Sequence, residues 1–322
     1  MSIQTLTTAH DAATSSTRTD GADTAAALVQ RALHVEPTAL VPQLLTQSGN
    51  TIHRVELADG RTVVLRVSSQ PAAYAHTEAN LAALRALGLP VQQVLAAGTA
   101  APGRSFVILN WLDGFDLKFA LPAMRADQMA AVAERVADCQ RRVAGLPASR
   151  GFGWAPIGRD AAHARWTDLF GAPADASVAV EATPLNQLRA RLRAVRATLE
   201  PYFAACTPVC FLDDLTTRNV IVDDGALSGF IDLDFVCYGD PLLQVGTTLA
   251  YLAADVGDAG RAYGDALVDC WSPSGDARRA MYFYAGLWTT GFLASAEAAG
   301  DAWRIRVLEP AARALLDAAE AD

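Results

Sequence analysis

Short apolar runs alternate with turn residues between about residues 40 and 112. Loops of only a few residues, such as "ADG" at 58–60, join these runs, and this arrangement predicts an antiparallel meander of strands. One segment of the region, residues 75–87, instead has apolar positions at helical spacing and ends at Gly88. The expected strands are QLLTQ (43–47), IHRVEL (52–57), RTVVLRV (61–67), VQQVLAAG (91–98) and SFVILNWL (105–112).

The pattern changes after residue 113, where helical periodicity dominates. Residues 123–145 have a helical pattern, and from Pro241 onward the chain is almost entirely helical in pattern, with a break near residues 272–275. In residues 184–204, apolar side chains recur at steps of three and four and form one stripe. The stripe consists of Leu185, Leu188, Leu192, Val195 and Leu199.

The two patterns together predict an α+β fold with two lobes. We expect residues 1–22, which are rich in Ser, Thr, Ala and Asp, to be a loose tail. A helix at 23–34 opens a small, β-rich N-lobe that extends to residue 112 (23–112). Residues 113–322 then form a larger, mostly helical C-lobe.

Composition and charge narrow the possible function classes. The chain has 322 residues, 52% of them hydrophobic, which is enough for a sizeable core. Its 26 basic and 35 acidic residues give a net charge of −9, whereas nucleic-acid-binding proteins usually carry a basic surplus. Five cysteines without a C-x-x-C pair suit a reducing cytosol. No signal peptide or long uncharged apolar run is evident, so we expect a cytoplasmic protein with no nucleic-acid or membrane partner.

The segment "CFLDDLTTRNVIV" at 210–222 carries the candidate chemistry. Asp214 and Asn219 lie five residues apart across a tight loop, and Asp232 ends the second strand of the hairpin that follows. Such hard oxygen ligands suit Mg²⁺, and a remaining aspartate can accept a proton from an attacking hydroxyl. A single Asp here would be ordinary turn chemistry, but two acids and an Asn at these spacings favour a catalytic site.

With these residues, the chain resembles the aminoglycoside phosphotransferase family, which has a protein-kinase-like fold. The family's loop reads roughly H-G-D-x-x-x-x-N-(V/I)-(L/I)-V, followed by I-D-x-x-x-x-x-G-D-P, and "LDDLTTRNVIV" and "IDLDFVCYGDP" match its spacing. The resemblance covers roughly residues 40–300. It implies that Asp214 is the catalytic base and that Asn219 and Asp232 hold Mg²⁺. It also suggests a catalytic role for Arg218, which would pair with Asp214 and steady its carboxylate.

The N-terminal half agrees with this resemblance, which implies a site for ATP or GTP. The loop "QSGNT" would cover the phosphates, although an ordinary hairpin turn explains its single glycine equally well. Arg66 stands where kinases usually carry lysine and can grip phosphate, and Glu78 would pair with it from the helix. Either charge alone would be read as a surface position. The implied nucleotide contacts are Ser48, Gly49, Arg66, Glu78 and the backbone of Asn110 and Leu112.

Several positions depart from the family pattern. Leu212 replaces the loop histidine, Gln244 replaces an aspartate often found after G-D-P, and Arg66 replaces the lysine. These departures keep open a second class of function, a nucleotide-binding pseudokinase with a regulatory role. Asp213 replaces a glycine, and solvation is its simplest explanation.

The acceptor is expected to be a small hydroxyl-bearing molecule. The G-D-P motif begins seven residues after Asp232, which leaves no room for the long segment on which a protein kinase docks a polypeptide. An acidic run would suit a cationic, amine-bearing substrate, with a solvated helix face as the alternative. The run consists of Asp255, Asp258, Asp265 and Asp269.

An aromatic-rich stretch, residues 151–170, resembles one in hygromycin-type phosphotransferases and is a candidate substrate wall. Its Trp154 and Trp166 are nevertheless residues that more often pack in a core. Antibiotic inactivation, and hence antibiotic resistance, is the favoured subclass of function. A metabolic kinase acting on a sugar, amino alcohol or amino acid is the alternative enzyme.

Overall fold

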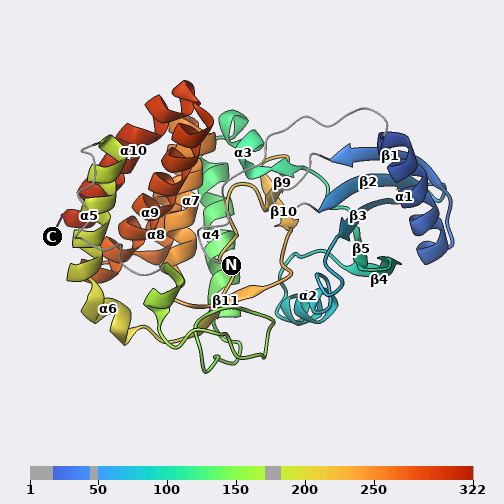
Figure 1. The fold of residues 1–322 in the computed structure, drawn as a ribbon, viewed down its shortest axis with the longest axis horizontal. Helices are drawn as coiled ribbons and strands as arrows, with labels where there is room; N and C mark the ends of the chain where they lie inside the picture. The colour runs from blue at the N-terminus through green and yellow to red at the C-terminus, as the bar shows by residue number, and fades with distance from the viewer. Residues whose placement is uncertain (1–16, 44–49, 171–182, 322) are drawn as a thin grey trace. The chain divides into compact units, whose positions relative to one another are not determined.

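The computed structural model describes residues 17–43, 50–170 and 183–321 (Figure 1). The described residues divide into two compact units, one that ends at Asp113 and one that begins at Gly114. The first unit is a small antiparallel sheet with helices, and the second is mostly helical. The α+β class and the lobe types predicted from the sequence are therefore confirmed.

The N-lobe is built on one five-stranded antiparallel sheet with the strand order β1-β2-β3-β5-β4. Leu65 pairs with His53 on one side and with Ile108 on the other, which fixes the register of the central strands. The meander expected from the short turns is present. The elements are α1 (Thr17–Leu33), β1 (Pro37–Gln43), β2 (Thr51–Leu57), β3 (Thr62–Ser68), α2 (Thr77–Ala86), β4 (Val94–Ala101) and β5 (Arg104–Asn110).

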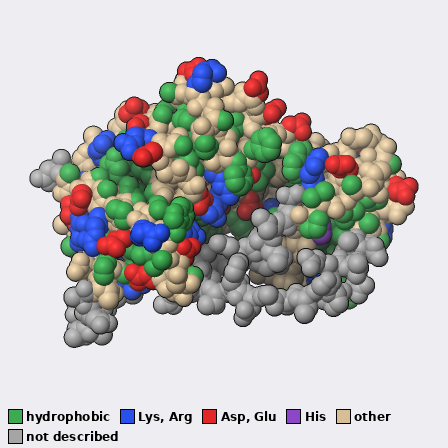
Figure 2. Space-filling model, turned by 90° about the horizontal axis from the view of Figure 1, so that it is seen from above, with side chains coloured by type: hydrophobic (Ala, Val, Ile, Leu, Met, Phe, Trp, Pro, Cys, Tyr) green, Lys and Arg blue, Asp and Glu red, His purple; other side chains and the backbone are tan. Residues whose placement is uncertain are grey.

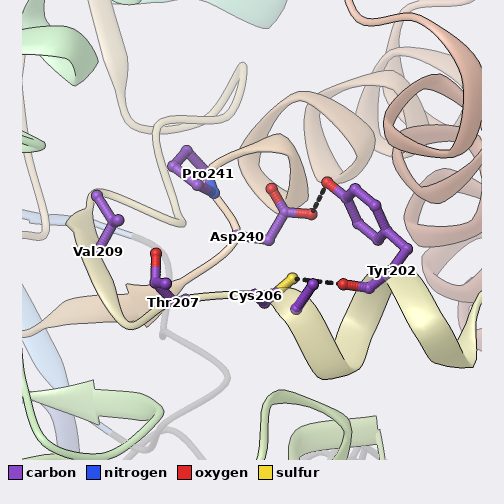
Figure 3. Close-up of a pocket in the computed structure, with 8 residues that line it drawn as sticks. Tyr202, Cys206, Thr207, Val209, Asp240 and Pro241 are labelled. Carbon is purple, nitrogen blue, oxygen red and sulfur yellow. Dashed lines mark hydrogen bonds between the residues drawn. The ribbon is translucent and has the colours of Figure 1, made fainter.

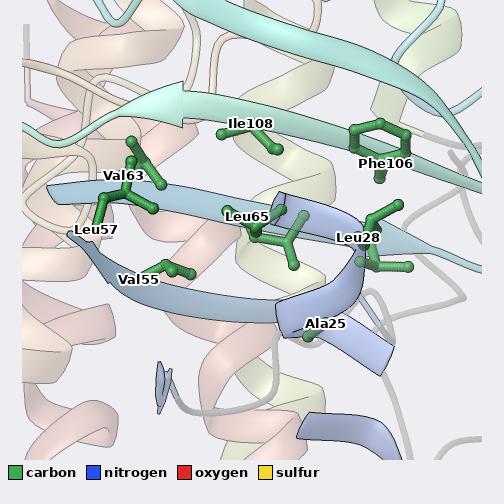
Figure 4. Close-up of a cluster of buried hydrophobic side chains, with 10 residues drawn as sticks. Ala25, Leu28, Val55, Leu57, Val63, Leu65, Phe106 and Ile108 are labelled. Atoms are coloured by element: carbon green, nitrogen blue, oxygen red, sulfur yellow. The ribbon is translucent and has the colours of Figure 1, made fainter. Parts of the chain in front are cut away.

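An apolar cluster joins α1 to one face of this sheet (Figure 4). Successive strand residues point to opposite faces, so alternate positions of β2 and β3 are directed into the cluster. Leu65 and Ile108 at its centre are fully buried. The labelled members are Ala25, Leu28, Val55, Leu57, Val63, Leu65, Phe106 and Ile108.

Two elements of the N-lobe, α1 and β1, differ most from the sequence prediction. Helix α1 begins at Thr17, within the stretch expected to be a tail, because extending an existing helix is far less costly than starting one. The first strand is Pro37–Gln43 rather than 43–47, and residues 44–47 lie outside the described chain. Two prolines hide this strand in the sequence, and the sheet tolerates them because β1 is an edge strand.

The C-lobe begins with a short strand that pairs with the hairpin of the candidate site. Gly114, at φ +114°, allows this close approach, since a Cβ there would lie 2.3 Å from the Val222 carbonyl oxygen. Two three-stranded sheets, β10-β9-β6 and β7-β11-β8, accompany the helices. The strands are β6 (Phe115–Asp116), β7 (Gly153–Ala155), β8 (Val209–Phe211), β9 (Val220–Asp223), β10 (Ala226–Phe230) and β11 (Val236–Gly239).

Helices make up most of the remaining C-lobe, and α7, α9 and α10 pack against one another. Leu188 and Leu192 of the predicted apolar stripe are buried in α5, as expected. Among the described residues, no helix is long and apolar enough to cross a membrane. The helices are α3 (Leu117–Ala120), η2 (Leu121–Ala123), α4 (Ala126–Val143), η3 (Trp166–Phe170), α5 (Pro184–Thr198), α6 (Glu200–Ala205), α7 (Leu242–Asp255), η4 (Gly257–Gly260), α8 (Arg261–Trp271), α9 (Gly275–Ala299) and α10 (Ala302–Glu320).

A buried polar chain crosses the aromatic core of the C-lobe. The Trp166 indole N–H donates to the Tyr284 hydroxyl over 2.7 Å, and that hydroxyl donates to Asp240 over 2.8 Å. Tyr202 donates to the same carboxylate over 2.8 Å, beside a surface pocket of about 250 Å³ (Figure 3). Trp166 is 1% exposed, so it is a core residue and not part of a substrate wall.

Candidate active site

The loop between β8 and β9 holds Asp214 and Asn219 against each other. The Asn219 side-chain Nδ2 donates to the Asp214 carbonyl over 3.0 Å, and Thr216 Oγ1 donates to Asp214 Oδ1 over 3.4 Å. The first bond engages the nitrogen of the Asn219 amide, so its oxygen is the atom suited to a cation. Asp214 is exposed, while Asn219 is buried at 9% exposure.

Asp232 reaches the same place from the hairpin. The N–H of Ile231 donates to the Asn219 carbonyl over 3.0 Å, which ties the end of β10 to the loop. Asp232 itself has φ +62°, a left-handed conformation that is uncommon for a residue with a side chain and that clusters at functional sites. The structure thus brings together Asp214, Asn219 and Asp232, and their chemical roles remain predictions.

Carboxylates crowd this loop and oppose one another's ionisation. Burial by surrounding protein, followed by the charges of Asp213 and Asp232, raises the pKa of Asp214 to about 7, while hydrogen bonds from Asn219 and Thr216 act in the opposite direction. The Asp214 side chain is accessible to solvent, although many protein atoms surround its carboxylate. Burial also raises the pKa of Asp213 to about 6. The charges of Asp213 and Asp232 thus add to the effect of burial on Asp214.

Asp213 is not the solvated residue expected from the sequence. The indole N–H of Trp154 donates to Asp213 Oδ2 over 2.6 Å, and Trp154 lies on β7, which pairs with β11. This bond connects the aromatic-rich stretch with the loop between β8 and β9. The signal in the sequence was the Trp within "GFGWAP", but nothing local identifies its partner.

Two glutamine side chains hold the backbone on either side of Asp214. Gln140, from α4, donates through Nε2 to the Leu212 carbonyl over 2.6 Å and accepts the Leu212 N–H over 2.9 Å. Gln244, from α7, donates to the Leu215 carbonyl over 2.8 Å. Both side chains are fully buried. Sequence reasoning noted Gln244 only as a departure and missed Gln140 entirely.

Arg218 does not pair with Asp214 as predicted. Its guanidinium binds Asp255 at the end of α7 through two hydrogen bonds of 2.7 and 3.0 Å and lies 4.8 Å from the centroid of the Tyr251 ring. The prediction relied on a spacing of four residues, which brings side chains together on a helix but not across this loop. Arg218 therefore anchors the end of the loop that precedes β9 to α7.

The acidic run on α7 and α8 is partly neutralised. Asp255 pairs with Arg218, and Asp258 pairs with Arg261. Paired carboxylates attract an amine less strongly than free ones, so the argument for a cationic acceptor loses support. Acidic and basic side chains also adjoin each other across the face in Figure 2, as expected for a surface with many ion pairs.

The predicted phosphate contacts of the N-lobe are only partly described. Ser48 and Gly49 lie outside the described residues. Arg66 on β3 is 8% exposed, and its guanidinium lies 5.2 Å from the centroid of the Tyr74 ring. Glu78 lies in the first turn of α2. The expected Arg66–Glu78 pair stays a prediction, and Glu78 itself is exposed on its helix.

The backbone expected to bind adenine is tied up at Asn110. The Asn110 N–H donates to the Gln93 carbonyl over 3.1 Å, and the Asn110 carbonyl accepts from Gln92 over 2.9 Å. Only a second lone pair of that carbonyl remains for a ligand. In the described part of the chain no hydrogen bond uses the backbone of Leu112, so Leu112 is the better placed of the two predicted contacts.

The N-terminal unit combines an antiparallel sheet with α1 and α2, and the mostly helical unit that follows carries Asp214 and Asn219 on a loop ahead of the hairpin that leads to Asp232. This arrangement defines a protein of the kinase-like class. A family model described as "Phosphotransferase enzyme family" matches residues 43–284. The chain belongs to this family and is a phosphotransferase.

Solved structures share this fold at low sequence identity. Aminoglycoside phosphotransferase APH(4)-Ia is 17% identical, with 94% of this chain and 100% of that chain covered and a TM-score of 0.67. Aminoglycoside 2′-phosphotransferase-IIIa is 15% identical, with coverages of 90% and 96% and a TM-score of 0.63. A candidate fructosamine-3-kinase from Thermobifida fusca is 18% identical, with coverages of 91% and 98% and a TM-score of 0.54. No curated protein sequence matches the chain.

Proposed function

We propose that the chain transfers the γ-phosphoryl group of a nucleoside triphosphate to a hydroxyl group of a small, antibiotic-like molecule. The observation that carries the proposal is the meeting of Asp214, Asn219 and Asp232 on one loop and its adjoining hairpin. In this arrangement Asp214 is the base, and Asn219 and Asp232 are the metal ligands. Membership of the phosphotransferase family supports the reaction class.

The donor set fits a divalent cation such as Mg²⁺. Mg²⁺ prefers oxygen ligands and uses few protein groups, with phosphate and water completing its shell. The Asp232 carboxylate and the Asn219 amide oxygen supply such ligands, and the mutual repulsion of Asp213, Asp214 and Asp232 is the cost that a cation would remove. When bound, the ion would neutralise charge on the transferring phosphoryl group.

The role of Asp214 follows from its accessibility and its raised pKa. As the acceptor oxygen bonds to the γ-phosphorus, the hydroxyl proton passes to the Asp214 carboxylate and the bond to the β-phosphate oxygen breaks. A base is most effective when its pKa lies near the working pH, and the pKa of about 7 for Asp214 satisfies this condition. The hydrogen bond from Thr216 to Oδ1 orients the carboxylate.

The N-lobe is proposed to bind the nucleotide through Arg66 and Leu112, with Ser48 and Gly49 over the phosphates. ATP is the proposed donor and GTP the alternative. Solved relatives divide on this point, since APH(4)-Ia is described with ADP and AMP-PNP and aminoglycoside 2′-phosphotransferase-IIIa with GDP.

Antibiotic phosphorylation is the proposed subclass because the structural relatives APH(4)-Ia and APH(2″)-IIIa are described in complexes with hygromycin B and kanamycin, respectively. A second candidate is a metabolic kinase with an uncharged acceptor. The pairing of Asp255 with Arg218 and of Asp258 with Arg261 favours it, because these acids are no longer unpaired sites for an amine.

The experiment is an acceptor screen with Mg-ATP and Mg-GTP. The panel contains amine-bearing antibiotics, including hygromycin B and kanamycin, beside uncharged sugars of similar size. Phosphorylation is read as a mass gain of one phosphoryl group together with nucleoside diphosphate release, and Asp214→Asn is the control. Turnover of amines alone supports the antibiotic subclass, and turnover of uncharged acceptors supports the metabolic kinase. Tight nucleotide binding with no turnover of any acceptor would favour the pseudokinase instead.

A further inference from the structure

We propose that Gln140 and Gln244 are positioning residues that hold the loop around Asp214 in its reactive geometry. This inference rests on the proposed function, in which Asp214 is the base. The two side chains come from different helices, α4 and α7, and bond to the backbone two residues before and one residue after Asp214. The family pattern has a histidine at position 212 and often an aspartate at position 244. Gln140 bonds to the backbone of residue 212, and Gln244 occupies the second position.

Gln140 forms a closed pair of hydrogen bonds with Leu212. Its amide donates to the Leu212 carbonyl over 2.6 Å and accepts the Leu212 N–H over 2.9 Å, so both backbone polar groups of that residue are satisfied by one side chain. Gln140 and Leu212 are buried at 0% and 1% exposure. Water therefore cannot replace either bond, and a buried group left without its partner is costly.

Gln244 acts from the opposite side as a donor. Its Nε2 donates to the Leu215 carbonyl over 2.8 Å and to Thr248 Oγ1 over 3.0 Å, and its Oε1 has no partner among the described residues. Thr248 lies within 3.4 Å of the same Leu215 carbonyl. The loop thus needs a donor at position 244, and an ionised aspartate there would supply none.

The same helix continues to hold the loop beyond Gln244. Tyr251 and Asp255 lie 7 and 11 residues further along α7, on the same helical face, and engage Arg218. The loop is therefore fixed at Leu212, Leu215 and Arg218, and Asp214 lies between the first two of these points. Neutral amides suit this place because Asp213 and Asp214 already repel each other, and a further carboxylate would add to that repulsion.

The test uses isosteric variants, Gln140→Glu and Gln244→Glu, with Gln140→Leu and Gln244→Leu beside them. Each Glu keeps the shape but loses the N–H donors when ionised, so kcat should fall at least about 10-fold at pH 9, while the nucleotide Kd changes less than about threefold. A protonated carboxyl can donate again, so the ratio of variant to parent kcat should rise as pH falls towards 6. The Leu variants should lose kcat at every pH.

A control separates positioning from general stability. Leu316→Ala in α10 makes a cavity against Gly286 without touching the loop, and it should keep parental kcat at temperatures below its unfolding transition. The proposal is overturned if the Glu variants keep kcat within about threefold of the parent at all pH values, or if Leu316→Ala lowers kcat as much as they do.

Amide hydrogen exchange makes the outcome independent of turnover. In the variants of Gln140 and Gln244, exchange of the loop amides from Leu212 to Asn219 should accelerate at least about 10-fold. Exchange of the amides of the N-lobe sheet should stay unchanged. If the parent phosphorylates no acceptor, the proposed function fails, yet this measurement still decides whether the glutamines hold the loop. Unchanged loop exchange would refute the inference even in an active enzyme.

Discussion

The N-lobe sheet and the loop between β8 and β9 in the C-lobe are held by different kinds of interaction. In the sheet, fully buried apolar side chains such as Leu65 and Ile108 pack beneath α1, and no single contact is directional. In the loop, the backbone is held by buried amides from Gln140 and Gln244, and the acids repel one another. The comparison shows that apolar burial holds the sheet, whereas directional hydrogen bonds fix the geometry of the loop.

Replacing the proposed base should separate activity from stability most clearly. Asp214→Asn is expected to lower kcat about 10³-fold, within the range for loss of a general base. Because the raised pKa means that ionised Asp214 costs stability above neutral pH, the metal-free variant should be more stable at pH 8 by about 1 kcal/mol after screening at this exposed side chain. The difference should shrink as pH falls from about 7 towards 4.

Steady-state kinetics and denaturant titrations of metal-free protein at both pH values measure the two effects. A variant that turns over like the parent removes Asp214 from the mechanism. A variant less stable than the parent at pH 8 would contradict the inference that ionised Asp214 destabilises the folded protein.

The converse change in the sheet should affect stability and spare chemistry. Leu65→Ala deletes a fully buried side chain, so the free energy of unfolding should fall by about 2–5 kcal/mol. kcat measured on the folded fraction should stay within about threefold of the parent. Chemical denaturation of the two proteins gives the first quantity. A loss below about 1 kcal/mol would mean that the apolar cluster is not the main support of the sheet.

A metal ligand should show an intermediate, ligand-dependent effect. Asp232→Ala is expected to weaken binding of the Mg-nucleotide about 10- to 100-fold while leaving binding of metal-free nucleotide nearly unchanged. Calorimetry with and without Mg²⁺ provides the comparison, and Asp223→Ala on the neighbouring hairpin strand is a matched acidic control. Equal affinity of the Asp232 variant and the parent would place the metal elsewhere.

The smallest expected effects distinguish the two arginine–aspartate pairs near the end of α7. The side chains of Arg218 and Asp255 are 35% and 13% exposed, whereas those of Arg261 and Asp258 are 72% and 92% exposed. Asp255→Asn should therefore lower the free energy of unfolding by about 1 kcal/mol, and Asp258→Asn should lower it clearly less. Thermal unfolding at low and high salt measures both, and equal losses would contradict a structural role for the Arg218 pair.

Local periodicity predicted most of the fold. Alternating apolar positions gave β2 and β3, and steps of three and four gave α5, because both patterns report the burial of one face. The sequence analysis missed the edge strand β1, because its two prolines interrupt the alternation of apolar and polar residues. It also missed the start of α1, because residues that only extend a helix need no distinctive composition.

The candidate site was predicted as a set of residues but not as a set of contacts. The spacing of Asp214, Asn219 and Asp232 identified them, because a tight loop and a short hairpin keep their backbones close together. The same reasoning assigned Arg218 to Asp214 and Glu78 to Arg66. The first pairing was wrong, because the partner of a side chain depends on which elements pack nearby, and Arg218 pairs with Asp255. The second stays a prediction.

The sequence by itself determined the lobe types, the reaction class and the three oxygen-bearing residues of the loop and hairpin, because local spacing encodes each of them. Only the tertiary structure decided what holds that loop. Gln140 is 72 residues from Leu212, Trp154 is 59 from Asp213, and Asp255 is 37 from Arg218. No local pattern encodes such partners, because a hydrogen bond between distant residues depends on the packing of whole helices against the loop.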